Sequence, residues 1–247
     1  TCGTIYTKLF PDSYFYSSLE HSVGVALIVW HFTHDRKQTL AGLFHDIATP
    51  AFKHCVDYMN GDYMTQESTE ELTTEIIKSS KEIMRLLKRD GVEVSEVDDY
   101  HQYPIADNDT PQLSADRLEY SLSNSLFVYV QNMMERVRDI YNDLEVQINS
   151  DKEVELGFRT KKLARDFVRT TSKMSVIYSD DRTRYSMQFI ADILKKLNEN
   201  GDIEVEDLYR LSEAEVIKII ESSRYSNAFK IWKNAREVKI SEVEPSG

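Results

Sequence analysis

The segment LAGLFHDIATPAFKH, residues 40–54, places a His and an Asp next to each other in an apolar setting. An ionised carboxylate such as that of Asp46 is expensive to bury unless it is paired or bound to a cation. On a helix the side chains of His45 and Asp46 leave about 100° apart, and both can still reach one ion between them. The pair therefore indicates either part of a metal site or two hydrogen-bonded core residues.

A metal ion needs more ligands than these two, and the sequence offers two further candidates. His21 begins the apolar segment HSVGVALIVWHF, residues 21–32, and Asp116 lies near the start of ADRLEY, residues 115–120. Two imidazoles and two carboxylates suit Mn, Fe, Co, Ni or Zn and, less well, Mg. A divalent ion in such a set makes a bound water nucleophilic at neutral pH. These four residues could therefore hold one divalent metal ion, whose identity they do not fix, and the alternative of hydrogen-bonded core residues stays open at this point.

Helices are expected to position all of these residues. In residues 36–48 the apolar side chains of Leu40, Leu43, Phe44 and Ile47 recur at helical spacing, and Pro50 ends that helix. Further helices are predicted over 21–32, 73–91, 115–131, 137–146, 163–174, 184–201 and 211–223. Ser212 and Glu215 form a capping-box pattern at the start of the last of these.

The composition favours an all-α protein with a sizeable core. The chain has 247 residues, of which 41% are hydrophobic, with eight Gly and five Pro. Its net charge of −12 argues against a broad nucleic-acid-binding surface. Two cysteines make no disulfide framework, which favours a reducing cytoplasm. No apolar run of membrane-spanning length and no signal peptide is visible, and because the sequence begins with Thr1 we expect the N-terminus to be incomplete.

Three segments in this order, LEHSVGVALIV, LAGLFHDIATPAFKH and ADRLEY, resemble the HD-domain superfamily of metal-dependent phosphohydrolases. The nearest branch resembles the deoxynucleoside triphosphate triphosphohydrolases, and the likeness runs from about Phe15 to Tyr120. The resemblance implies an HD-domain helical core over residues 1–131, on which helices of residues 132–247 pack as an extension. It also implies metal ligation by His21, His45, Asp46 and Asp116.

The resemblance further implies roles for residues around the metal. His54 and Asp57 match the family pattern F-x-H-x-x-D and are expected to orient ligands or to contact substrate. Glu67 is expected to hydrogen-bond water at the metal, and the fork of Arg117 to contact phosphate. The predicted catalytic residues are Asp46, Glu67 and His54, and the predicted substrate contacts are Arg117, Tyr120, Asp57 and Gln66.

The chain also departs from the family pattern. Ser18 and Gln66 stand where the family has a phosphate-gripping Arg and a catalytic His, Thr49 replaces another His, and Ser123 and Asn124 replace an Arg-Asp pair. Gln has no acid or base chemistry to offer, so these departures argue against triphosphohydrolysis.

Two hypotheses follow from this comparison. One is a phosphohydrolase that acts on a nucleotide or another small phosphoester through a metal-activated water. The other is a non-catalytic module that binds metal and nucleotide as a sensor or structural site. No nucleic-acid or membrane partner is expected, and the family often forms homo-oligomers.

Overall fold

The computed structural model describes residues 4–10, 16–61, 72–128 and 133–239. The described part is largely α-helical, as predicted, with one two-stranded sheet. The chain divides into two compact units. Unit 1 comprises Thr1–Phe15, Pro50–Ser68 and Ile177–Gly247, and unit 2 comprises Tyr16–Thr49 and Thr69–Val176.

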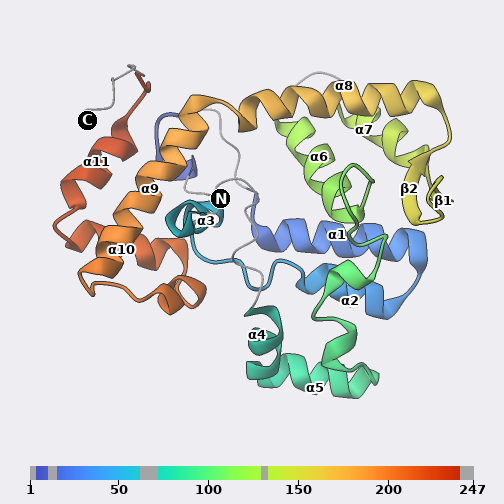
Figure 1. Cartoon of the computed structure of the whole chain (residues 1–247), viewed down its shortest axis with the longest axis horizontal. Helices are drawn as coiled ribbons and strands as arrows, with labels where there is room; N and C mark the ends of the chain where they lie inside the picture. The colour runs from blue at the N-terminus through green and yellow to red at the C-terminus, as the bar shows by residue number, and fades with distance from the viewer. Residues whose placement is uncertain (1–3, 11–15, 62–71, 129–132, 240–247) are drawn as a thin grey trace. The chain divides into compact units, whose positions relative to one another are not determined.

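Unit 2 contains most of the elements in Figure 1. They are α1 (Ser18–Thr33), α2 (Arg36–Phe44), α4 (Thr73–Ser79), α5 (Lys81–Asp90), α6 (Ala115–Val128), α7 (Met133–Asn142), β1 (Leu144–Ile148), β2 (Val154–Phe158) and α8 (Lys161–Tyr178), whose end enters unit 1. Two short 3-10 helices, Val94–Glu96 and Tyr100–Gln102, lie between α5 and α6.

The core of unit 2 brings α1, α6 and the hairpin together. Val25 and Val29 of α1 and Leu118 of α6 are fully buried in one cluster with Leu144 and Leu156 of the strands. Helix α1 packs beside α2 and against α6 (Figure 1). A second cluster joins the apolar face of α2 to α4, α5 and the segment that follows α5. These contacts fix the helices that carry the predicted metal ligands.

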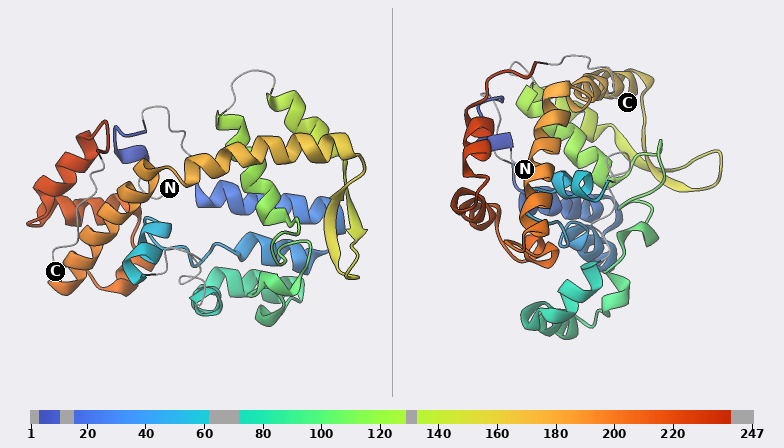
Figure 2. Two further views of the ribbon diagram at one scale, coloured as in Figure 1. Left: turned by 45° about the horizontal axis from the view of Figure 1, so that its top comes forward. Right: turned by 60° about the vertical axis from the view of Figure 1, so that its left-hand side comes forward.

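The β-hairpin corrects the prediction of a helix over 137–146. Helix α7 ends at Asn142, and β1 pairs antiparallel with β2 from Leu144↔Phe158 to Ile148↔Val154. Figure 2 shows the hairpin at one end of unit 2, leading into α8. Burial of Leu144 and Leu156 in the core, together with the backbone pairing, outweighs the helical spacing of the local sequence.

Two predicted helices end or break early. Helix α2 stops at Phe44 instead of residue 48, because the side chain of His45 donates from Nδ1 to the Gly42 carbonyl at 2.7 Å. If the helix continued, the Gly42 carbonyl would instead accept from the backbone N–H of Asp46. The predicted helix over 73–91 is two helices, since Ser80 has extended backbone and its hydroxyl caps α5 by accepting from the Ile83 N–H.

Unit 1 has its own core. Its described elements are a 3-10 helix (Thr4–Tyr6), α3 (His54–Asn60), α9 (Asp181–Glu199), a second 3-10 helix (Val205–Tyr209), α10 (Glu213–Ser222) and α11 (Ser226–Asn234). Phe52, Ile190, Leu194 and Phe229 are fully buried together in this core. The predicted capping box of Ser212 and Glu215 is confirmed at the start of α10.

The two units do not coincide with the predicted division after residue 131. Helix α7, the hairpin and most of α8 belong to unit 2, because Ile140, Leu144 and Leu156 pack in the same cluster as Val25 and Leu118. Residues 50–61 instead belong with the C-terminal helices in unit 1, where α3 packs on α9. Among the described helices, none combines the length and apolar character needed to cross a membrane.

Candidate metal centre

Three separate segments of unit 2 supply the predicted ligands. His21 lies in the first turn of α1, which starts at a capping box between Ser17 and Glu20. Asp116 lies in the first turn of α6. His45 caps the C-terminus of α2, and Asp46 follows it in a turn, so the pair sits just past a helix and not inside one.

The four side chains converge. The Nε2 atoms of His21 and His45 are 3.1 Å apart. The Oδ1 atom of Asp116 lies 3.0 Å from Nε2 of His21 and 3.7 Å from Nε2 of His45. The Oδ1 atom of Asp46 lies 3.9 Å from Nε2 of His45. The structure therefore brings together all the residues that were predicted as metal ligands.

These separations suit a divalent ion. Ligands about 2.1 Å from an ion are about 3.0 Å apart when adjacent in an octahedron and about 4.2 Å apart when opposite. All four measured distances fall between 3.0 and 3.9 Å. One ligand atom each from His21, His45 and Asp46 lies within 4.8 Å of the others, so this group could hold a metal ion.

Hydrogen bonds orient both imidazoles so that Nε2 faces the centre. Nδ1 of His45 donates to the Gly42 carbonyl at 2.7 Å. Nδ1 of His21 lies 2.5 Å from Oε2 of Glu119 and donates to that carboxylate. With Nδ1 protonated in both rings, Nε2 is the atom that can bind a cation.

The carboxylates around His21 favour its protonated, positively charged form. Burial lowers the pKa of His21, but hydrogen bonds to Asp116 and Glu119 outweigh this effect and raise the pKa to about 9. Burial raises the pKa of Asp116, but its contacts with His21 and His45 prevail, and the net pKa is lowered. A proton on Nε2 of His21 thus occupies a position built for positive charge.

The site is open on its carboxylate side. The side chains of His21 and His45 are 11% and 3% exposed, whereas those of Asp46 and Asp116 are 23% and 21% exposed. Tyr120 follows Asp116 by one turn of α6 and is partly exposed. Burial and the charge of Asp116 raise the pKa of Tyr120, so its hydroxyl stays protonated and can donate to an anion.

The guanidinium of Arg117 makes hydrogen bonds and an ion pair within unit 2. Its Nε donates to the Gln112 carbonyl at 2.9 Å, and one terminal nitrogen donates to the backbone and side-chain oxygens of Asn108. The other terminal nitrogen lies 3.2 Å from Oδ1 of the buried Asp107. The guanidinium that was predicted to contact phosphate therefore braces the 107–112 segment.

Two further predicted residues lie in unit 1. His54 and Asp57 belong to α3 in unit 1, where Nδ1 of His54 is 2.9 Å from Oδ2 of the buried Asp57. Backbone φ is positive at Phe52 and Lys53, just before this pair. Gln66 and Glu67 lie outside the described residues.

Two residues near the centre were missed by the sequence analysis. Glu119 is buried and bonds His21, and its place three residues after Asp116 on α6 is a signal that could have found it. Tyr100 lies in a 3-10 helix between α5 and α6, and its ring centroid is 5.2 Å from that of His45. Nothing in the local sequence around Tyr100 indicates this contact.

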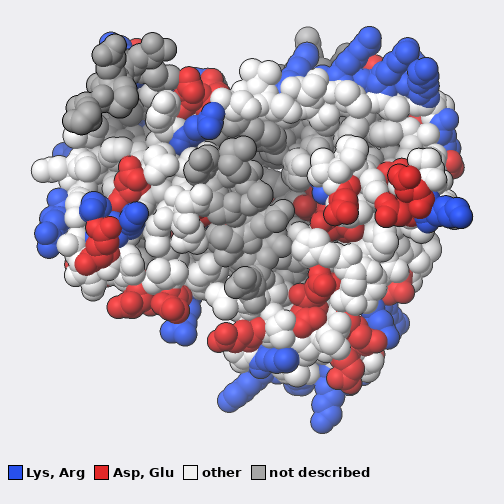
Figure 3. Space-filling model, in the orientation of Figure 1, with Lys and Arg blue, Asp and Glu red and all other residues white. Residues whose placement is uncertain are grey.

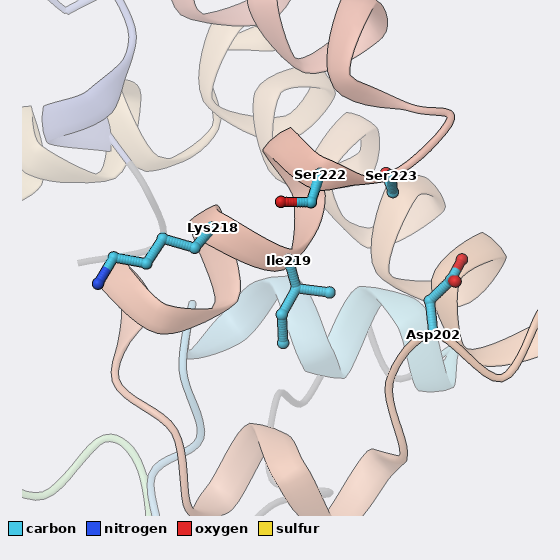
Figure 4. A pocket seen from close by; sticks show the side chains of 5 residues that line it. All are labelled: Asp202, Lys218, Ile219, Ser222 and Ser223. Carbon is cyan, nitrogen blue, oxygen red and sulfur yellow. The ribbon is translucent and has the colours of Figure 1, made fainter.

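A depression of about 350 Å³ lies in unit 1 and contains none of the predicted site residues. Its lining residues are Asp202, Lys218, Ile219, Ser222 and Ser223. Figure 4 shows Lys218 and Asp202 at opposite ends, extending away from each other. Its charged groups do not converge, so it offers no evident chemistry.

Basic charge is local on the surface. Figure 3 shows Lys and Arg side chains gathered over α8, where Lys161, Lys162, Arg165 and Arg169 are exposed. Elsewhere on that face acidic and basic side chains are interspersed. This distribution agrees with the net charge of −12.

Comparison with known proteins adds one distant relative. No family model matches the chain. Over 216 residues the chain is 24% identical to YdhJ of Bacillus subtilis strain 168, an uncharacterized protein. The match covers 83% of this chain and 61% of the relative's length, so the chain spans less than two thirds of the protein that it is similar to.

Proposed function

We propose that this protein is an HD-type metal-dependent phosphohydrolase that acts on a nucleotide or another small phosphoester. The observation that carries the proposal is the convergence of two imidazoles and two carboxylates from α1, the end of α2 and α6. A divalent ion bound there would lower the pKa of a water toward neutrality and polarise a phosphoryl oxygen. Such a donor set suits Mn, Fe, Co, Ni or Zn, with Mg a weaker fit.

The protein's own residues would perform distinct tasks in this proposal. His21 and His45 present Nε2 to the ion, and Asp46 and Asp116 balance its charge. The protonated hydroxyl of Tyr120 donates to a phosphate oxygen at the open side of the site. The proposal places the protein in a reducing cytoplasm, in keeping with a sequence of only two cysteines.

Metal analysis of purified protein tests the site first. We expect about one equivalent of a divalent metal in the wild type and much less in Asp46→Ala, since that variant loses a charged ligand. His31→Gln is a matched control, because His31 lies exposed on α1 and outside the centre. Wild-type protein that takes up no Mn²⁺, Fe²⁺, Co²⁺, Ni²⁺ or Zn²⁺ would refute the proposal.

A substrate screen with the metal-loaded protein tests the reaction. Candidates are p-nitrophenyl phosphate, its bis-ester, and nucleoside mono-, di- and triphosphates. We expect phosphate, diphosphate or triphosphate release that depends on the metal and is lost in Asp46→Ala. Undiminished hydrolysis by that variant would assign the activity to another site or to a contaminant.

A second function, nucleotide binding without turnover, is favoured by the contacts that already occupy the guanidinium of Arg117. Its guanidinium braces the 107–112 segment, and Ser18 and Gln66 supply neither the cation nor the proton-transferring group of the family. A sensor of this kind would be stabilised by nucleotides in thermal unfolding with no product formed. Product formation in the screen decides for the enzyme.

A further inference from the structure

Glu119 is a buried carboxylate that is not one of the four proposed ligands. It is 6% exposed and lies on α6, three residues after Asp116, so both side chains leave the same side of the helix. Carboxylates are rarely buried to this extent unless they are paired. The burial of Glu119 therefore has to be explained by the groups that it contacts.

Three donors from three places hold this carboxylate. Oε2 accepts from Nδ1 of His21 at 2.5 Å. Oε1 accepts from the Ser123 hydroxyl at 2.6 Å and from the Tyr16 hydroxyl. Burial, together with the hydrogen bond to Glu119, raises the pKa of Tyr16 to about 12, so this hydroxyl stays protonated as a donor. Both oxygens of Glu119 are thus used, and the carboxylate has a fixed orientation.

Gly24 shows how closely α1 approaches this carboxylate. A Cβ at position 24 would lie 2.8 Å from both Cγ and Oε1 of Glu119. Because three hydrogen bonds hold the end of the Glu119 side chain, it cannot swing aside without losing them. Glycine weakens a helix relative to alanine, so its place inside α1 is explained by the space that Glu119 requires.

We propose that Glu119 is the positioning residue of the metal centre, that it fixes His21 with Nε2 toward Asp116, and that Tyr16 and Ser123 hold it in place. The inference rests on the proposed function only in that the centre must bind a divalent ion. A carboxylate behind a ligating imidazole fixes its tautomer and strengthens it as a ligand. Without Glu119, His21 would be free to rotate and would bind the ion more weakly.

Titration with Mn²⁺ alone tests this assignment. We expect Glu119→Gln to lower the Mn²⁺ affinity by about tenfold or more, since loss of such a partner typically weakens metal binding by about 10–100-fold. Tyr16→Phe and Ser123→Ala should each have a smaller effect, because either leaves two donors on Glu119. Gly24→Ala should also lower the affinity by displacing Glu119, although alanine favours the helix.

Controls separate positioning from folding. Tyr141→Phe and Ser125→Ala remove hydroxyls from unit 2 that do not contact Glu119, and both should bind Mn²⁺ as the wild type does. Urea unfolding without metal shows whether a variant is merely less stable, an effect that leaves the affinity of the folded protein unchanged. If Glu119→Gln does not fold, Gly24→Ala and Tyr16→Phe decide.

The outcomes distinguish the two proposals. If Glu119→Gln binds Mn²⁺ with the same affinity as the wild type, the positioning role is wrong and the metal centre still stands. If Glu119→Gln is unfolded, unchanged Mn²⁺ affinity in both Gly24→Ala and Tyr16→Phe leads to the same conclusion. Wild-type protein that binds neither Mn²⁺ nor, in repeats, Ni²⁺ or Zn²⁺ would overturn both.

Discussion

A proton and the proposed metal ion would compete for one atom, Nε2 of His21. The pKa of His21 is about 9, against an ordinary 6.5. Because the folded pKa is the higher one, the resulting stabilisation is complete below about pH 6.5 and is lost as the pH rises through about 9. The shift corresponds to roughly 3 kcal/mol.

Metal binding should therefore depend on pH in the opposite direction. Below pH 9 the ion must displace the proton, so we expect Mn²⁺ affinity to rise by about tenfold per pH unit from about pH 6 to pH 8. Thermal unfolding in EDTA and in Mn²⁺ across this range measures both effects. A metal-induced stabilisation that does not grow with pH would contradict the competition. In EDTA, His21→Gln should lack the loss of stability that the wild type shows between about pH 6.5 and pH 9.

Arg117 allows a prediction that separates a structural role from a substrate contact. Arg117→Ala removes one of the two ion-pair partners of the buried Asp107, the other being His101, and also the bonds to the 107–112 segment. We therefore expect a loss of about 2–3 kcal/mol in the free energy of unfolding. Urea denaturation measures it. Arg85→Ala, which breaks an exposed pair with Glu82, should change stability far less. Unchanged stability of Arg117→Ala would favour the phosphate contact that the sequence predicted.

At this scale the sequence predicts residue types better than contacts. His21, His45, Asp46 and Asp116 were predicted as one set because imidazoles and carboxylates are suitable metal ligands and because the HD-domain resemblance implies this ligation. Glu119 and Tyr100 were missed, because their contacts depend on which faces of distant segments meet. Arg117 illustrates the same limit, since its neighbours Asn108 and Gln112 come from an irregular segment.

At the scale of elements, the cap of α1 sets the position of the first metal ligand. The Ser17 hydroxyl accepts from the Glu20 N–H, and the carboxylate of Glu20 accepts from the Ser17 N–H. Glu20 directly precedes His21. Ser17→Ala should lower stability by about 1 kcal/mol and should also weaken Mn²⁺ binding, because the first turn of α1 frays. Urea unfolding and Mn²⁺ titration together provide the measurement.

The same capping box in unit 1 is the matched control. Ser212→Ala at the start of α10 should lose a similar amount of stability, because Ser212 and Glu215 make the same pair of contacts. It should leave Mn²⁺ affinity unchanged, since the proposed ligands all lie in unit 2. Equal Mn²⁺ affinities in both variants would show that the cap of α1 does not position His21.

Helical periodicity predicts where helices exist but not where they end. The start of α10 could be predicted from Ser212 and Glu215, because a capping box is a local pattern. The end of α2 could not, since it depends on a side-chain bond from His45 to Gly42. The hairpin was missed because Leu144 and Leu156 gain their burial from partners far away in sequence, including Val25 and Leu118.

For the whole molecule, the division into two units decides which parts a ligand can stabilise directly. All four proposed metal ligands lie in unit 2, whereas His54 and Asp57 lie in unit 1. The sequence could not show this division, because residues 50–61 follow the His45-Asp46 pair directly but belong with helices more than 100 residues later. The family resemblance, which treats residues 1–131 as one body, does not contain that information.

Hydrogen exchange can test the two units separately. A ligand that binds only the folded state slows local opening of the elements that hold it. We therefore expect Mn²⁺ to slow amide exchange in the first turn of α1, around residues 42–46 and in the first turn of α6. Helices α9, α10 and α11 should exchange as before.

A nucleotide that contacts His54 and Asp57, as the family resemblance implies, should extend the protection to α3 in unit 1. Protection confined to unit 2 with both metal and nucleotide would remove these two residues from the proposed substrate site, and protection of neither unit by Mn²⁺ would contradict the metal centre itself.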